Sequence, residues 1–255
     1  MMMVTVEVSR FDPRSDKGAW VQAYTVEAEG TDRVLDLLTR IKDTLDSSLS
    51  FRYSCAHGVC GSDAMRINDK ERLACKTLVR DVVAAGVAAV IRVAPLRHLP
   101  VQRDLIVDQT GFFQRAKTVA PFLLPAADSA PADGRETLQS AEQHLQFEDA
   151  TKCINCAACF SACPVLDKNP RFLGPAAIVQ AARFVEDSRD WGLAPRLDVL
   201  DTPDGVWACE SNFECTRVCP RGIKVTKLIN LMKKRVTQER ARRGETVHDA
   251  AGKGA

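Results

Sequence analysis

The chain has 255 residues, 45% hydrophobic and 27% charged, with a formal net charge of +2 and ten cysteines. This globular composition leaves room for about two domains and says little about partners. The longest apolar run, Val82–Ile91, has ten residues and is too short to cross a bilayer, which takes roughly 20. Met1–Phe11 lacks the apolar core of a signal peptide, so we interpret the cysteines as metal ligands in a reducing compartment, not disulfides.

The first elements predict a small sheet with a helix packed on it. Val4–Val8 alternates apolar and polar residues like a half-buried strand, and Trp20–Val26 follows as its partner. Thr31 or Asp32 can cap a helix whose apolar stripe extends from Val34 to Leu45. Two strands followed by a packing helix are compatible with a β-grasp domain.

The next stretch has the spacing of a plant-type 2Fe-2S ferredoxin loop. Cys55 and Cys60 are separated by four residues, and Cys75 supplies the distant ligand. The third position of the motif holds Asp63, whose carboxylate can bind ferric iron. The alternative is that Asp63 caps a turn and that another group or water completes the site.

Two glycines and a histidine lie within this loop. Gly58 and Gly61 allow the backbone to wrap closely around a cluster and to aim N–H groups at its sulfides. His57 is either a Rieske-like ligand or a solvated loop residue, and the cysteine spacing favours the second interpretation.

Further periodic segments predict where the domains divide. Strands are expected at Ala64–Ile67 and Ala88–Val93, and prolines near residue 100 predict that a first domain spans residues 1–105. A second, mostly helical domain then spans 106–243 and is followed by a frayed tail, 244–255. Its expected segments are a helix Leu105–Lys117, a loop Pro121–Gly134, a helix Arg135–Phe147, a helix Pro175–Asp187 and a helix Val225–Val236.

The second domain contains a C-x2-C-x2-C-x3-C-P run that ends at Cys163-Pro164. In two-cluster ferredoxins, the fourth cysteine of such a run binds the other cluster. The spacing therefore predicts a 4Fe-4S cluster held by Cys153, Cys156, Cys159 and Cys219. It leaves Cys163, Cys209 and Cys215 for a further cluster.

That further cluster lacks one thiolate. A full repeat beginning at Cys209 would place a cysteine at position 212, where the chain has Asn212. Three thiolates and one vacant corner predict a 3Fe-4S cluster. Four-thiolate zinc is the alternative, although zinc sites usually consist of two separated cysteine pairs.

The stretch Arg221–Arg243 contains nine lysines and arginines and one acid, Glu239. Such a segment either attracts anionic lipid or an acidic partner, or is a solvated helix face.

Over nearly its whole length the chain resembles the iron–sulfur subunit of succinate dehydrogenase and fumarate reductase. The motifs that carry the resemblance are Cys55–Asp63, Leu73-Ala74-Cys75, Cys153–Pro164, Asn169–Ala176, Asp187–Asp190 and the Cys209, Cys215, Cys219-Pro220 half. The resemblance implies an α+β chain, with an N-terminal β-grasp 2Fe-2S ferredoxin domain and an all-α, bacterial-ferredoxin-like domain with two clusters. Some members have Asp at the position of Asp63, where it is taken as a ligand.

The resemblance also implies an assembly. A partner flavoprotein with covalently held FAD interconverts succinate and fumarate, and this subunit passes electrons through its 2Fe-2S, 4Fe-4S and 3Fe-4S clusters. Membrane-anchor subunits hold a quinone near the three-iron cluster. The subunit itself has no catalytic residue and binds no nucleic acid. Its expected place is the cytoplasmic face of a bacterial plasma membrane, attached through its partner chains.

The chain departs from the family at the quinone end. Ubiquinone-linked members commonly have Trp-Trp where this chain has Asp167-Lys168, and His where it has Glu210. Asn169–Ala176 has the shorter spacing of menaquinone-linked fumarate reductases, so one alternative is that the complex works mainly as a menaquinol:fumarate reductase. Another alternative is that the chain serves a different flavoprotein dehydrogenase. Beside Pro164, Lys168 or Glu210 either hydrogen-bonds a quinone or forms a solvated charge pair.

Overall fold

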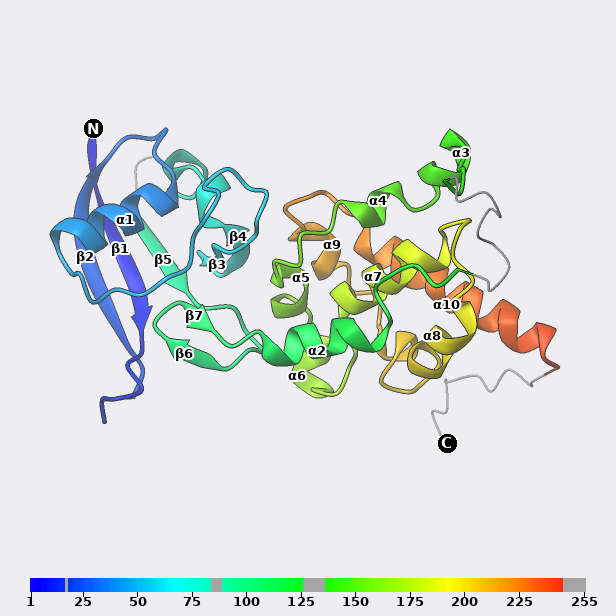
Figure 1. Ribbon diagram of the computed structural model, residues 1–255. Helices are drawn as coiled ribbons and strands as arrows, with labels where there is room; N and C mark the ends of the chain where they lie inside the picture. The colour runs from blue at the N-terminus through cyan, green and yellow to red at the C-terminus, as the bar shows by residue number, and fades with distance from the viewer. Residues whose placement is uncertain (17, 84–88, 126–135, 245–255) are drawn as a thin grey trace. The chain divides into compact units, whose positions relative to one another are not determined.

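The computed structural model describes residues 1–16, 18–83, 89–125 and 136–244 (Figure 1). The chain divides into two compact units, and each is described by itself. The first contains Met1–Gly111 together with Ile154–Ala162, and the second contains Phe112–Cys153 and the residues from Cys163 onward. Part of the second cysteine run therefore packs with the N-terminal unit. The expected tail falls almost wholly outside the described residues.

A five-stranded mixed sheet forms the centre of the first unit (Figure 1). Its order is β2-β1-β5-β3-β4, with β1 antiparallel to β2 and parallel to β5. The strands are β1 (Met2–Arg10), β2 (Trp20–Ala28), β3 (Ala64–Ile67), β4 (Lys70–Leu73) and β5 (Val90–Ala94). The structure confirms the first three predicted strands and a fourth at Val90, whereas β4 was not predicted.

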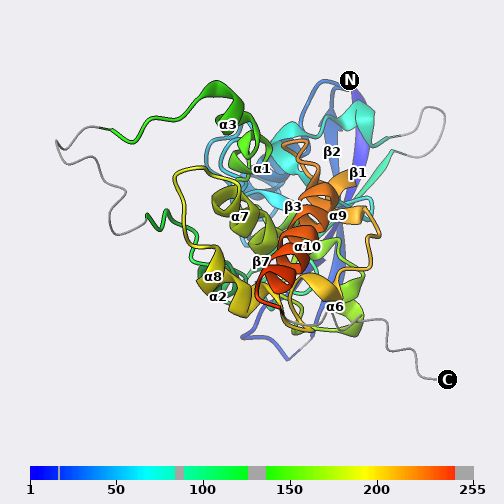
Figure 2. The same ribbon diagram turned by 90° about the vertical axis from the view of Figure 1, so that its right-hand side faces the viewer.

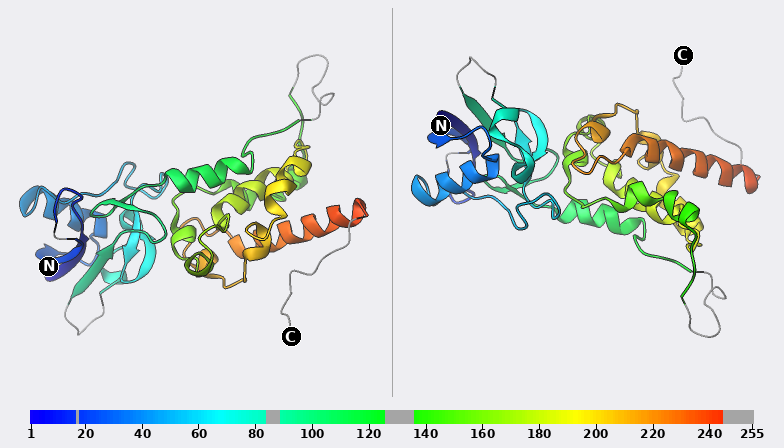
Figure 3. Two further views of the ribbon diagram at one scale, coloured as in Figure 1. Left: turned by 90° about the horizontal axis from the view of Figure 1, so that it is seen from below. Right: turned by 90° about the horizontal axis from the view of Figure 1, so that it is seen from above.

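Helix α1 (Val34–Thr44) lies across one face of this sheet (Figure 3). Its apolar stripe is buried against Val4, Val6 and Val8, none of which is exposed to solvent. The predicted cap was wrong, because Arg33 is the N-cap in an extended conformation and Asp36 accepts its N–H at 2.9 Å.

Two short turns lie between β4 and β5, and a hairpin after β5 contradicts one predicted helix. They are the 3-10 turns η1 (Ala74–Lys76) and η2 (Val79–Asp81) and the hairpin strands β6 (Val101–Arg103) and β7 (Ile106–Val107). The helix expected over Leu105–Lys117 begins only at Thr110, as α2 (Thr110–Thr118), because β7 pairs with β6. Asp108 accepts the Thr110 N–H at 2.8 Å and closes the turn before the helix.

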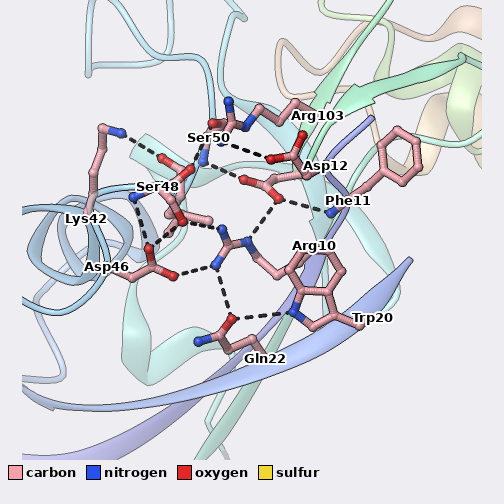
Figure 4. A network of polar contacts seen from close by, with 12 residues as sticks. Arg10, Phe11, Asp12, Trp20, Gln22, Lys42, Asp46, Ser48, Ser50 and Arg103 are labelled. Atoms are coloured by element: carbon pink, nitrogen blue, oxygen red, sulfur yellow. Dashed lines mark hydrogen bonds and ion pairs between the residues drawn. The ribbon is translucent and has the colours of Figure 1, made fainter. Parts of the chain in front are cut away.

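A buried arginine ties the loops of the first unit together (Figure 4). Arg10, 4% exposed, donates to Asp104 at 2.9 Å, to Asp46 at 2.6 Å and to Ser48 at 2.9 Å. Asp104 also accepts the N–H of Ser50 at 2.8 Å. The end of β1 is thereby joined to the segment that precedes the first cysteine loop.

The described part of the second unit is helical. Its elements after α2 are α3 (Ala141–Leu145), α4 (Glu148–Thr151), α6 (Val165–Lys168), α7 (Pro175–Val185), α8 (Leu193–Leu200), η3 (Val206–Ala208), α9 (Glu214–Arg217) and α10 (Val225–Arg242). Helices α7 and α10 pack side by side (Figure 2). None of the helices formed by the described residues is long and apolar enough to cross a membrane.

The helix expected over Arg135–Phe147 is shorter than predicted. Within it, the described helix is α3, which begins after Ser140, whose hydroxyl accepts the Gln143 N–H at 3.2 Å. Phe147 leaves the helical conformation before α4 starts. The helices predicted from Pro175 and from Val225 are confirmed, and the second continues to Arg242.

A second buried arginine, Arg196 in α8, joins the residues that follow α2 to the residues that precede α8. It is fully buried and pairs with Asp190 at 2.6 Å. It also donates to the Val119, Ala120 and Phe122 carbonyls at 2.8–3.0 Å.

Several arginines of α10 and its C-cap residue Arg243 are paired within the chain. Arg235 binds Glu186, Arg240 binds Asp201, and Arg242 and Arg243 both bind Glu239. These pairs involve four of the nine lysines and arginines of Arg221–Arg243, and both interpretations of that segment stay predictions.

Candidate iron–sulfur cluster sites

The loop between α1 and β3 turns its backbone N–H groups toward the first cysteine. Ala56, Gly58 and Gly61 have left-handed φ angles of 55°, 84° and 72°, which a non-glycine residue rarely adopts. The N–H groups of His57, Val59 and Cys60 point at the Cys55 sulfur, at 3.5, 3.4 and 3.3 Å. These N–H groups, with that of His57 foremost, lower the pKa of Cys55 to about 6. The thiolate that binds iron is therefore favoured before any metal arrives.

Asp63 and Cys75 lie together beneath this loop. Asp63 is 2% exposed, and its Oδ2 accepts the Cys75 N–H at 2.5 Å. Burial first, and then the Asp63 carboxylate, raise the pKa of the Cys75 thiol to about 12. Asp63 Oδ1 is buried and has no hydrogen-bond partner within the described chain. A buried carboxylate oxygen without a partner is unfavourable unless a cation binds it, so the residues fit a cluster iron here.

The two oxygens of Asp63 therefore have different surroundings, and ligation of iron by Asp63 stays a prediction. One oxygen caps a backbone N–H, as the turn alternative requires, and the other is free to bind iron. His57 is exposed, and its Nδ1 lies 2.5 Å from the Cys55 carbonyl oxygen, which agrees with the solvated-loop interpretation.

The second cysteine run is anchored to the first unit by a buried serine. Ser161, at the end of α5 (Ala158–Ser161), donates to Glu71 at 2.8 Å and accepts the Arg97 N–H at 2.8 Å. Gly61 lies against Cys156 so closely that a Cβ on this glycine would be 2.7 Å from the Cys156 Cβ. Two predicted ligand loops are therefore in contact within one unit.

The predicted 4Fe-4S ligands are divided between the two units. Cys156 and Cys159 belong to the first, and Cys153 and Cys219 to the second. This ligand set stays a prediction from the spacing of the cysteines.

The second unit brings Cys163, Cys209 and Cys215 to the wall of one pocket, with Asn212 beside them. Burial first, together with the charges of Cys215 and Cys209, raises the pKa of Cys163 to about 11. Burial likewise raises the pKa of Cys215. As thiolates, these three sulfurs would repel one another. They therefore fit a cluster, because its iron cations would offset their negative charges. Asn212 supplies no thiolate, and its amide donates to Glu210 at 3.3 Å.

The residues predicted near a quinone lie on the rim of this pocket. Pro164 and Glu210 line it. Lys168 forms an ion pair with Glu210 at 3.3 Å, with side chains 70% and 49% exposed. The hydrogen bond from Asn212, and then Lys168, lower the pKa of Glu210. The Lys168–Glu210 pair is exposed to solvent, which agrees with the interpretation of a solvated charge pair. The same exposure makes it accessible to a ligand.

Hydroxyl groups beside the cysteine sulfurs were missed by the sequence analysis. Ser62 Oγ lies 3.1 Å from Cys60 Sγ, and Thr226 Oγ1 lies 3.4 Å from Cys215 Sγ. Ser62 lies inside the loop motif, two residues after Cys60, and this short separation could have indicated a contact between its hydroxyl and the sulfur. Thr226 lies eleven residues beyond Cys215, and no motif marked it.

Among the described residues, no group of three or more histidine, cysteine, aspartate or glutamate side chains is close enough to hold a single metal ion. Cluster ligands differ from the ligands of one ion, because they are shared among several irons that sulfides bridge.

Two family models match the chain. A 2Fe-2S iron–sulfur cluster binding domain matches residues 5–114, and a 4Fe-4S dicluster domain matches residues 149–223.

Curated relatives align with nearly the whole chain. A fumarate reductase iron–sulfur subunit of Mycobacterium tuberculosis is 44% identical over 88% of both chains. One from Haemophilus influenzae is 38% identical, covering 89% of this chain and 91% of the relative. A succinate dehydrogenase iron–sulfur subunit of Coxiella burnetii is 36% identical, covering 92% and 98%.

A solved structure is also similar. A chain of the Mycobacterium smegmatis Sdh1 complex in the apo form superposes with a TM-score of 0.82 and 29% identity. The alignment covers 96% of this chain and 98% of that one.

Proposed function

Because the chain belongs to the iron–sulfur subunits of succinate dehydrogenase and fumarate reductase, we propose that it carries electrons between an FAD-containing flavoprotein subunit and a quinone. Its conductors are a 2Fe-2S, a 4Fe-4S and a 3Fe-4S cluster. The chain supplies no substrate chemistry; it fixes the positions of the clusters and adjusts their potentials.

The observation that carries this proposal is that two thiol sets converge, each with one substituted position. Asp63 stands at that position in the first set and Asn212 in the second. A carboxylate can keep a ligand on iron, whereas a neutral amide leaves a corner vacant. The substitutions therefore predict a complete 2Fe-2S cluster and an incomplete, three-iron cluster.

The ligands follow from these sites and from the cysteine spacing. Cys55, Cys60, Asp63 and Cys75 hold the 2Fe-2S cluster, Cys153, Cys156, Cys159 and Cys219 hold the 4Fe-4S cluster, and Cys163, Cys209 and Cys215 hold the 3Fe-4S cluster. When bound, the clusters supply reversible one-electron transfer.

The family supports further proposals about architecture and assembly. The domains are a β-grasp domain over residues 1–105 and a bacterial-ferredoxin-like, all-α domain over 106–243. The flavoprotein and membrane-anchor subunits are the partners, and they attach the chain to the cytoplasmic face of the plasma membrane. The quinone binds near Pro164, Lys168 and Glu210, on the rim of the three-thiol pocket.

A second direction, menaquinol:fumarate reductase, is favoured by one specific feature. Lys168 and Glu210 form an ion pair where ubiquinone-linked relatives commonly have aromatic residues and histidine. Purifying the complete complex and comparing succinate oxidation with fumarate reduction, using ubiquinone and menaquinone analogues, separates the two directions.

Metal analysis tests the cluster assignment. We expect about nine irons and about ten acid-labile sulfides per chain, the sums over the three clusters. Bound zinc with negligible sulfide would contradict the assignment. If succinate is oxidised by this chain without any flavoprotein, the role of conductor is wrong.

A further inference from the structure

A pair of threonine hydroxyls lies directly behind one wall of the three-thiol pocket. Thr226, in the first turn of α10, is 1% exposed and lines the pocket. Its Oγ1 lies 3.4 Å from Cys215 Sγ and 3.0 Å from Thr216 Oγ1. The backbone N–H of Thr226 donates to Thr216 Oγ1 at 3.0 Å. The two hydroxyls are therefore fixed to each other and to one sulfur.

The direction of these hydrogen bonds follows from the donors and acceptors present. A cysteine sulfur that binds iron has lost its proton, so it can only accept. Thr216 Oγ1 already accepts the Thr226 N–H, which leaves its own proton free to be donated to Thr226 Oγ1. Thr226 Oγ1 then donates its proton to Cys215 Sγ. The result is a short chain of hydrogen bonds that ends on the sulfur.

Such a bond acts on a cluster through charge. Reduction adds one negative charge, part of which lies on the ligand sulfurs, and a hydrogen-bond donor stabilises that charge. Hydrogen bonds to the sulfurs are among the factors that set cluster potentials. Because Thr226 is buried, water does not screen the interaction, and the chain of hydroxyls strengthens it.

We propose that Thr226, oriented by Thr216, is a positioning residue that raises the reduction potential of the three-iron cluster through its hydrogen bond to Cys215. The inference rests on the proposed function, because it requires Cys215 to bind that cluster. It adds a potential-setting residue that the cysteine motifs do not contain.

A purely structural role for Thr226 makes a different prediction. In that role, the backbone N–H of Thr226 near the start of α10 donates to the Thr216 hydroxyl, and the Thr226 side chain only packs against its neighbours. In that case its replacement would change stability but not the potential of a correctly formed cluster. The potential therefore separates the two roles.

The experiment compares Thr226→Val with Thr226→Ser in the assembled complex, by titrating the electron spin resonance signal of the oxidised three-iron cluster. Valine keeps the shape and removes the hydroxyl, and serine keeps the hydroxyl. At the wild-type midpoint potential, Thr226→Val should lower the ratio of reduced to oxidised cluster about tenfold, equivalent to about 59 mV for one electron. Thr226→Ser should restore the wild-type ratio.

A matched control lies on the same helix. Thr237 donates to the Lys233 carbonyl at 3.0 Å and contacts no cysteine sulfur by any hydrogen bond among the described residues. Thr237→Val should leave the potential unchanged. Thr216 also hydrogen-bonds Cys215 through its side chain and its backbone N–H. Thr216→Val removes the hydroxyl that orients Thr226 and keeps the backbone N–H, so it should lower the potential in the same direction.

The outcomes separate this inference from the proposed function. A normal signal with unchanged potential in Thr226→Val would overturn the role of Thr226 and leave the cluster assignment intact. If Thr226→Val does not assemble, an unchanged potential in Thr216→Val overturns it instead. A wild-type complex without any three-iron signal would overturn the cluster assignment itself.

Discussion

At the scale of single residues, two positions of the cysteine motifs hold a residue other than cysteine. Asp63 keeps an anionic donor in its site, and Asn212 provides a neutral one. The sequence alone indicated both positions, since each breaks a spacing of cysteines. What it could not indicate is that one Asp63 oxygen is bound by the Cys75 N–H while the other has no partner. That division depends on the tertiary position of the turn η1, which no local pattern encodes.

Replacing Asp63 tests whether its free oxygen binds iron. Asp63→Cys should retain a 2Fe-2S cluster with a shifted potential, because a thiolate suits the site. Asp63→Ala should lower cluster occupancy, because it removes the donor. Visible absorption and a redox titration measure both effects, and an unchanged spectrum and potential in Asp63→Ala would mean that Asp63 is not a ligand.

Replacing Asn212 tests the vacant corner. Asn212→Cys adds a thiolate beside Cys209 and Cys215, so a fourth iron can bind and the cluster should become 4Fe-4S, with a lower potential. Electron spin resonance should show loss of the oxidised three-iron signal. If that signal persists unaltered in an assembled variant, the geometry of the loop, and not the missing ligand, decides the cluster type.

At the scale of elements, periodicity predicted the helices and strands whose apolar residues lie on one side. It failed where pairing with another strand determines the secondary structure. The helix α1 and strands β1 and β2 are one-sided, and their apolar positions are the buried ones. Strand β7 has only two residues, and its pairing with β6 shortened the helix expected from Leu105. Strand β4 was missed because Lys70–Leu73 has three charged residues among four.

The contact between two ligand loops gives a prediction with a matched control. Gly58 and Gly61 both have left-handed φ angles, so alanine at either should cost about 1–2 kcal/mol. The atoms nearest to a Cβ at Gly58 belong to the side chain of Lys76, which can move, whereas a Cβ at Gly61 overlaps Cys156. Gly61→Ala should therefore destabilise the first unit by about 1–3 kcal/mol more than Gly58→Ala.

Chemical denaturation of the two glycine variants measures this difference, and iron analysis reports which clusters remain. Equal destabilisation by the two alanines would mean that Cys156 yields freely and that the contact does not constrain the loops.

At the scale of the whole molecule, each unit is held by one buried arginine. Arg10 joins the loops of the first unit, and Arg196 joins those of the second. Neither was singled out from the sequence, because arginines are usually exposed and the partners of Arg10 extend 94 residues along the chain. Long-range polar networks of this kind leave no periodic signal.

Removing either arginine should destabilise its own unit. Arg10→Leu leaves Asp104 buried without its partner, and Arg196→Leu does the same to Asp190, at about 3–5 kcal/mol each. Arg10→Leu should lose the 2Fe-2S signal first on heating, and Arg196→Leu the three-iron signal.

Arg14→Leu is the control, because the Arg14 side chain is 74% exposed, and it should change stability by less than about 1 kcal/mol. Simultaneous loss of both signals in each leucine variant would show that the units do not unfold separately.

The division of the chain into units also has a consequence for biosynthesis. The first unit includes Ile154–Ala162, which the ribosome makes after more than forty residues of the second unit. Until Ser161 has emerged, Glu71 lacks the hydroxyl that binds it, and the surface beside Gly61 is not covered by Cys156. The N-terminal unit therefore completes its folding only after much of its successor has been translated. A nascent chain arrested at Gly111 would present an unfinished surface to the machinery that delivers iron and sulfide.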